Sequence, residues 1–258
     1  MGESFLLSLV VAAFVGGAAA YLGSLMITRK MALVGDALGH VALPGMGVAL
    51  VLNLDVAFGA FASLAVGILL IWQLGERTLL SLETLVGIVF VSSLALGFLV
   101  VPQPDLLESL LGDVSHVSLL GALAAVVLST AVFLLIKRIY PGMMLLGISG
   151  DLAAVEGIAA RRYNLMYLGA VALIVAIGVK VTGSLLVGAL VIVPPATARI
   201  VSANMKRYAT SSGVIGVFAS VAGIAASRLV GFPPGPAIIL VSALLFVLAL
   251  AAKKAGWM

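Results

Sequence analysis

The chain contains no cysteine, and only 9% of its residues are charged. Without cysteine there is no disulfide, no thiolate metal site and no cysteine nucleophile. Such a low charge content argues against a soluble domain, because soluble domains are usually about 25% Asp, Glu, Lys and Arg. With only 2 histidines and 10 acidic residues, any metal site must come from a very small set of side chains.

Apolar residues fill most of the sequence. They make up 63% of the 258 residues, and the mean hydropathy is +1.31. A helix needs roughly 20 apolar residues to cross about 30 Å of hydrocarbon, and stretches of that length recur along the whole chain. The sequence therefore predicts an all-α integral membrane protein, with 1–258 forming a single transmembrane domain in the lipid bilayer.

Hydropathy divides the chain into about nine candidate spans, which predicts a polytopic helix bundle. The first segment lacks the basic leader and the cleavage pattern of a secretory signal, so we expect a retained helix. An eight-span alternative merges the sixth and seventh segments, which are tightly joined, into one re-entrant unit. The predicted spans are 5–27, 33–52, 56–74, 83–101, 117–136, 164–181, 183–200, 210–228 and 235–252.

Basic residues predict the orientation of these spans. If the chain alternates sides, all of its 14 Lys and Arg residues except Lys180 and Arg228 fall on one side. Under the positive-inside rule that side is cytoplasmic, so we expect the N-terminus outside and the C-terminus in the cytoplasm. The same pattern explains the net charge of +4 through topology, because the basic residues are scattered in short pairs, and we expect no nucleic-acid partner.

The stretch VGDALGHVALPG, residues 34–45, places Asp36 and His40 inside the second predicted span. A charge at the centre of a membrane helix costs about 2.5–3.5 kcal/mol, so an intramembrane acid points to function. The i, i+4 spacing puts both side chains on one face of a helix. A carboxylate and an imidazole there fit half of a divalent-metal site, a hydrogen-bonded pair that fixes packing, or a proton relay.

Prolines interrupt two of the predicted spans. Pro44 lies in the second span, and Pro194 and Pro195 lie in the seventh. A proline removes a helical hydrogen bond, and membranes tolerate this mainly where the freed backbone is buried in protein or lines a cavity. The two spans therefore either line a pathway or are kinked only to shape the bundle.

Asp113 and His116 form the other acid–histidine pair, at the outer end of the fifth span. The connection before them also carries acidic residues, so it predicts either a short outer helix around 104–115 with a solvated face or an acidic mouth that concentrates cations.

The segment 147–162 is too short and polar to span. Ser149 before Asp151 predicts a helix start, and Arg161 and Arg162 are expected to form a basic helix end. Such a helix either docks another protein or lies on anionic lipid.

Several ordered motifs together resemble the permease subunits of ATP-binding-cassette importers for zinc, manganese and iron. RKMALVGDALGHVALPGMGVAL is similar to the family's arginine-led Asp-Ala-Leu-(Ser/Gly)-His-x-x-Leu-Pro-Gly signature, and ETLVGIVFVSSLALGFLV to its next segment, with Glu83 where aspartate is more usual. LLGDVSHVS resembles its outer short helix, GDLAAVEGI its coupling helix, and GSLLVGALVIVPPATARIVS its late proline-containing helix.

The resemblance implies that Asp36 and His40 line the translocation path and contact the metal, with Asp113 and His116 as weaker candidates. The divalent metal, zinc, manganese or iron, would be the transported substrate, and no cofactor would be bound permanently. The segment 147–162 would insert into a cytoplasmic ATPase. Its implied coupling residues are Asp151, Glu156, Gly157, Arg161 and Arg162.

The family also implies partners and a location. Two permease chains, expected as a homodimer, would join two ATPases and receive metal from an extracytoplasmic binding protein at a prokaryotic cytoplasmic membrane. ATP would be hydrolysed only on the partner, and this chain agrees in having no G-x-x-x-x-G-K-[ST] loop. The chain is therefore expected to be a transport subunit and not an enzyme.

Two other hypotheses for Asp36 compete with this one. One is an autonomous secondary transporter of divalent cations, with Asp36 and His40 as a proton relay. The other, an intramembrane aspartyl protease, would need a second acid well within a span, and the sequence offers none.

Overall fold

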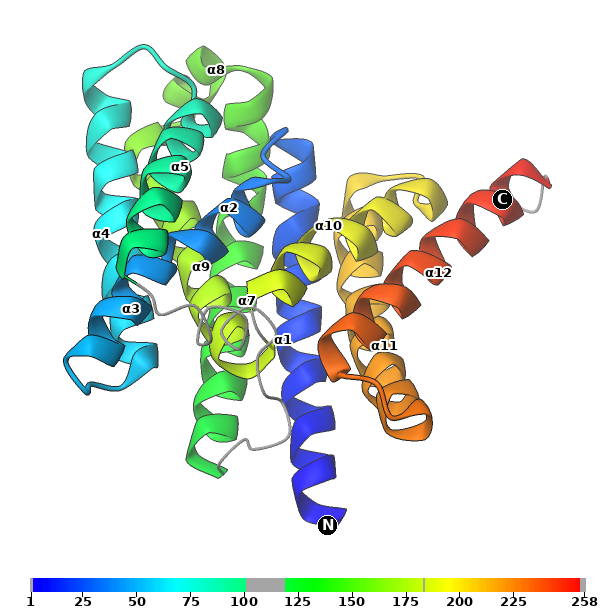
Figure 1. The fold of residues 1–258 in the computed structure, drawn as a ribbon. Coiled ribbons are helices and arrows are strands. Elements are labelled where there is room, and N and C mark those ends of the chain that lie inside the picture. The colour runs from blue at the N-terminus through cyan, green and yellow to red at the C-terminus, as the bar shows by residue number, and fades with distance from the viewer. Residues whose placement is uncertain (1, 101–118, 183, 256–258) are drawn as a thin grey trace.

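The computed structural model describes residues 2–100, 119–182 and 184–255, and all of its regular elements in these ranges are helices (Figure 1). The predicted outer helix around 104–115, with Asp113 and His116, lies outside the described residues. The helices are α1 (Gly2–Thr28), α2 (Val34–Val41), α3 (Leu43–Val51), α4 (Val56–Arg77), α5 (Leu82–Val100), α7 (Leu119–Ile148), α8 (Gly150–Val155), α9 (Ala160–Thr182), α10 (Ser184–Val201), α11 (Met205–Val230) and α12 (Pro234–Lys254).

The described helices confirm the prediction of a polytopic all-α membrane protein. Among the described residues, eight segments are long and apolar enough to cross a membrane, and α2 with α3 counts as one of them. A ninth apolar segment, Val187–Val201 of α10, is shorter. The first helix begins near one end of the bundle, and the last helix ends toward the other (Figure 1).

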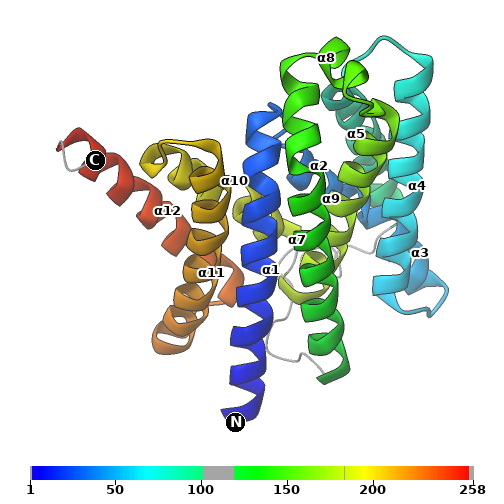
Figure 2. The ribbon, with the colours of Figure 1, turned by 180° about the vertical axis from the view of Figure 1, so that it is seen from behind.

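The helix α1 is the centre of the packing. It lies between α7 and α11, as Figure 2 shows from behind, and it also packs against α10. Leu22, Leu25 and Met26 have no exposed surface, so this turn of α1 is enclosed by its neighbours. The helix α12, by contrast, leans away from α1 and is held to the bundle through α10 and α11 (Figure 1).

The prediction for the fifth span was wrong at its end. The predicted span ends at residue 136, whereas α7 continues to Ile148 through Pro141. Lys137 and Arg138 predicted a loop there, but both are exposed on the helix surface. The helix therefore extends beyond the apolar part of the sequence. The extension is held by the buried Tyr140, whose hydroxyl lies 3.2 Å from the Ser24 hydroxyl, and by Gly142, which has no side chain to obstruct the Tyr163 ring.

Candidate metal site

The second membrane segment is broken directly after His40. The helix α2 ends at Val41 and α3 begins at Leu43, so Ala42 alone separates the two helices. Pro44 lies in the first turn of α3 and has no N–H to offer to the carbonyl of His40, four residues earlier. The break confirms that proline interrupts this span.

His40 is fixed by contacts on both sides of its ring. Its Nδ1 lies 3.0 Å from the backbone carbonyl of Asp36, and its ring meets the Phe90 ring of α5 edge-on at a centroid distance of 5.4 Å. The tautomer that satisfies this geometry carries the proton on Nδ1, which donates to the carbonyl. The Nε2 lone pair is then left to accept a proton or to bind a metal ion.

Asp36 is placed by α10. A Cβ added at Gly188 would lie 2.7 Å from Oδ1 of Asp36, so the carboxylate occupies space that any other residue at 188 would fill. Asp36 and His40 are both half-buried, one turn apart on the same helix. The structure therefore places both predicted side chains on α2, with Asp36 against α10 and His40 against α5.

These two side chains are too few for a closed metal site. Within residues 2–100, 119–182 and 184–255 there is no group of three or more His, Cys, Asp or Glu side chains that could hold a metal ion. Two protein ligands suit a transported ion, because conduction requires release as well as capture.

The predicted coupling segment contains a short, well-defined helix. Its start is at Ser149, as predicted, where the hydroxyl accepts a hydrogen bond of 3.2 Å from the N–H of Leu152. Its end is at Gly157, which has φ 73°, and the N–H groups of Gly157 and Ile158 donate back to carbonyls of the last turn. This glycine-terminated motif provides hydrogen-bond donors for the last carbonyl groups of a helix that is only six residues long.

The surface of α8 is open and partly apolar. Ile148, Leu152 and Val155 are 75%, 50% and 85% exposed, and Asp151 and Glu156 are exposed beside them. The helix α8 lies at one end of the bundle (Figure 1). Exposed apolar side chains beside acids at such a position are typical of a surface that docks another protein or lies on the membrane.

The prediction that Arg161 and Arg162 form the basic end of this helix was wrong. Both residues lie in the first turn of α9, after a turn that separates α9 from α8. Arg161 is held there by α4: its guanidinium carbon lies 4.4 Å from the centre of the Trp72 ring, and its Nε lies 3.5 Å from a carboxylate oxygen of Glu76. The basic pair therefore starts a membrane helix, and one of its members is fixed by contacts that do not depend on the dipole of α8.

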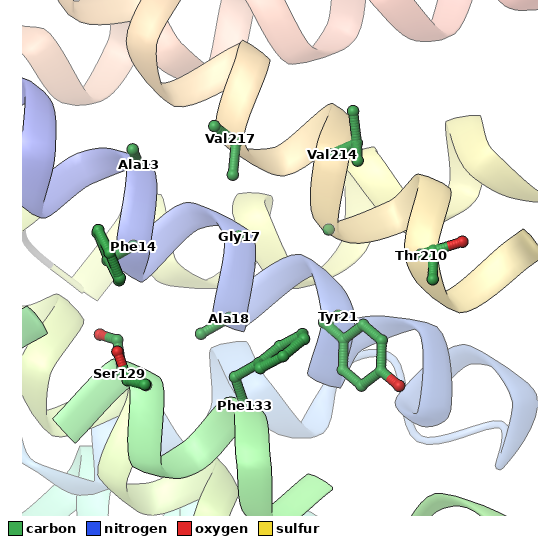
Figure 3. A pocket seen from close by; sticks show the side chains of 12 residues that line it. Ala13, Phe14, Gly17, Ala18, Tyr21, Ser129, Phe133, Thr210, Val214 and Val217 are labelled. Carbon is green, nitrogen blue, oxygen red and sulfur yellow. The ribbon is translucent and has the colours of Figure 1, made fainter. Parts of the chain in front are cut away.

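An apolar groove of about 490 Å³ lies between α1, α7 and α11 (Figure 3). Phe14, Tyr21 and Phe133 line it, and its polar lining groups are hydroxyls such as those of Ser129 and Thr210. Asp36 and His40 contact α10 and α5 instead, so this groove is separate from the candidate metal site.

The structure adds residues that sequence reasoning missed. Gly188 and Phe90 shape the space around Asp36 and His40, and Ser63 of α4 donates a hydrogen bond of 2.6 Å to the carbonyl of Val41 at the helix break. The only signal for Gly188 was its place within a family-like motif. For Ser63 there was none, because a single hydroxyl in an apolar span is usual.

Taken together, these features define a polytopic membrane protein with an acid and a histidine on the helix before a break, and with an exposed short helix at one end. The model of the ABC 3 transport family matches residues 1–253. The chain belongs to this family.

Similar proteins agree with this assignment. The chain is 29% identical to the high-affinity zinc uptake system membrane protein ZnuB of Buchnera aphidicola, over 88% of this chain and 89% of that one. It is 27% identical to the manganese import system permease protein ScaB of Streptococcus gordonii, over 93% and 88%. The solved structure of PsaBC from Streptococcus pneumoniae in complex with Fab matches with a TM-score of 0.79 and 26% identity, over 94% of this chain and 89% of that one.

Proposed function

We propose that this chain is the membrane permease of an ATP-driven importer that carries zinc or manganese ions into a prokaryotic cell. The observation that carries the proposal is the pairing of Asp36 and His40 at the helix break in a chain of the ABC 3 transport family. Zinc and manganese are preferred because similar proteins are named for these two ions. A carboxylate and an imidazole suit both.

In the proposed mechanism, a binding protein outside the cell delivers the ion to the permease. The ion is held briefly by the Asp36 carboxylate and by Nε2 of His40, and ligands from a second permease chain or from the binding protein complete its shell. The cytoplasmic ATPase docks on the exposed surface of α8, so Asp151, Glu156 and Gly157 serve coupling. ATP is hydrolysed on that partner, and this chain contributes the path and its movement.

The proposed orientation places the α8 end of the bundle in the cytoplasm. The inner connections carry most of the Lys and Arg residues, which favours that side under the positive-inside rule. The N-terminus then lies outside and the C-terminus inside.

The test is metal uptake into proteoliposomes that contain the complete complex, with the variant Asp36→Asn. Asparagine keeps the shape that packs against Gly188 but removes the charge, so uptake is expected to fall to background while the ATPase still assembles with the permease. Glu83→Gln is the matched control, because Glu83 is an exposed acid of α5. Undiminished uptake by Asp36→Asn would refute the site, and uptake by the permease without its ATPase would favour a secondary transporter.

A further inference from the structure

One face of α4 packs against the break between α2 and α3, beside His40. Gly59, Ser63 and Gly67 follow each other at intervals of four residues, so they share a face of the helix. Ser63 donates its hydrogen bond of 2.6 Å to the carbonyl of Val41. A Cβ added at Gly67 would lie 2.6 Å from a methyl carbon of Val41, so this side chain also sits directly on α4.

The contact continues along α3. Gly45 and Gly59 approach so closely that a Cβ on either one would collide with the carbonyl oxygen of the other. Two helices that touch through their backbones leave no flexible side chain between them to absorb a displacement. A shift of α4 must therefore move the α2–α3 break, and His40 with it.

The opposite face of α4 contacts Arg161, at the end of α4 that lies near α8. Trp72 lies nine residues after Ser63, which at about 100° per residue places it on the other side of the helix. Trp72 stacks under the guanidinium of Arg161, and Glu76, one turn further on, pairs with it. Arg161 follows the Gly157 turn that ends α8 by four residues, so this contact joins α4 to the segment next to the docking surface.

The two links differ in strength. The ion pair is largely in solvent, because the side chains of Arg161 and Glu76 are 62% and 42% exposed, and exposed pairs contribute little. The contact with the Trp72 ring adds a cation–π interaction. The link at Ser63 is shielded and reinforced by backbone packing, so the Arg161 link is the one that gives way first.

We propose that α4 transmits movement of α8 to the Asp36–His40 segment, with Trp72 and Ser63 as positioning residues on its two opposite faces. The inference rests on the proposed function, because it takes α8 as the element that the ATPase moves. Trp72 and Ser63 touch neither ATPase nor metal ion in this scheme. They couple ATP hydrolysis to metal release without contributing to either binding site.

The first test measures metal ions imported per ATP hydrolysed by the complete complex in proteoliposomes. Trp72→Leu is expected to lower this ratio about fivefold, which corresponds to losing one weak contact. Ser63→Ala should lower it by less, because the backbone packing beside Ser63 remains. ATPase assembly and hydrolysis should continue in both variants. Trp72→Phe keeps an aromatic ring under Arg161 and should restore most of the ratio. Ser92→Ala, at an exposed serine of α5, is the matched control and should behave as the parent does.

The double variant separates transmission from a general loss of stability. Links in series fail together, so Ser63→Ala with Trp72→Leu should be no worse than the more severe single variant. Independent structural defects would multiply instead. If both single variants keep the parent's ratio of metal ions to ATP, or if the double variant shows the product of the two losses, the proposal about α4 is overturned. The proposed function still stands in that case, because the parent imports metal. A parent that imports no metal would overturn both.

A second measurement does not depend on metal transport, so it also tests variants whose metal uptake is too low to measure. The chain has no cysteine, so Val48→Cys, at a 46% exposed position of α3, provides a single thiol. Nucleotide bound to the ATPase should change the rate at which this thiol reacts with a maleimide in the parent. The change should be lost with Trp72→Leu. A nucleotide effect that persists in Trp72→Leu, or that is absent from the parent, would contradict transmission through α4.

Discussion

The carboxylate of Asp36 on α2 lies against the backbone of Gly188 on α10, in space that a side chain at 188 would occupy. The two residues are more than 150 positions apart in the chain, yet the absence of a side chain at 188 leaves room for the carboxylate. Ionisable side chains within membrane segments almost always face the bundle interior or a water-filled cavity. Gly188 therefore belongs to the candidate metal site although it contributes no ligand.

Gly188→Ala is expected to weaken metal handling without removing a ligand. The added Cβ would meet Asp36 Oδ1 at 2.7 Å and must push the carboxylate aside. Overpacking of this kind costs about 1–3 kcal/mol, so the half-saturating metal concentration for uptake should rise about tenfold or more. Gly87→Ala is the matched control, because a Cβ there meets nothing within 4 Å. Equal uptake curves for the two variants would show that Gly188 does not position Asp36.

The geometry of His40 predicts a difference between two amide replacements. Its Nδ1 is used by the carbonyl of Asp36, which leaves Nε2 for the ion. The glutamine amide reaches the position of Nε2, whereas the asparagine amide reaches only that of Nδ1. His40→Gln should therefore retain part of the metal uptake, and His40→Asn should lose it. The reverse order, measured in the same proteoliposomes, would mean that Nδ1 is the ligand atom.

Gly157→Ala should loosen the end of α8. Gly157 has φ 73°, and a residue with a Cβ pays roughly 1 kcal/mol or more in this left-handed region. The dissociation constant for the ATPase should rise about fivefold, and amide hydrogen exchange at Gly157 and Ile158 should accelerate. Gly150→Ala is the control within the same helix, since its backbone is ordinary and a Cβ there meets nothing within 4 Å. Accelerated exchange with unchanged ATPase binding would exclude α8 as the docking element.

Single thiols can test the orientation, because the chain has no cysteine of its own. The connection between α3 and α4, which contains Leu54, and the helix α8, which ends at Val155, lie at opposite ends of the bundle (Figure 1). Leu54 and Val155 are 53% and 85% exposed. In intact cells a membrane-impermeant maleimide should label Leu54→Cys and should label Val155→Cys only after the membrane is opened. The opposite pattern would invert the proposed topology and would separate α8 from a cytoplasmic ATPase.

Much of the fold could be predicted because membrane helices are selected by length and hydropathy. The spans around α1, α4 and α12 follow directly from apolar runs and their flanking charges. The end of α7 could not be found in this way, because charged residues ended the apolar run while buried Tyr140 and Met143 continued the helix. The role of Arg161 was misjudged for a related reason: its partners Trp72 and Glu76 are distant in the chain.

The residues of the candidate site also fall into two groups, those that the sequence predicted and those that only the structure revealed. Asp36 and His40 stood out in the sequence because an acid and a histidine one turn apart are conspicuous in an apolar span. Gly188, Phe90 and Ser63 are ordinary residues of membrane helices, and only their placement gives them a part in the site. No periodicity or motif can reveal a contact between residues whose chemistry is unremarkable.

The sequence by itself determined that this protein lies in a membrane, that its second span carries a carboxylate and an imidazole, and that a short capped helix follows the fifth. Composition, spacing and capping are local properties, so they can be read along the chain. Only the tertiary structure decided where the Asp36 carboxylate lies, which ring fixes His40, and which helix joins the α8 segment to the break at Ala42. Those relationships depend on the close packing of helices distant in the sequence, where the lack of a single Cβ decides how near two backbones can come.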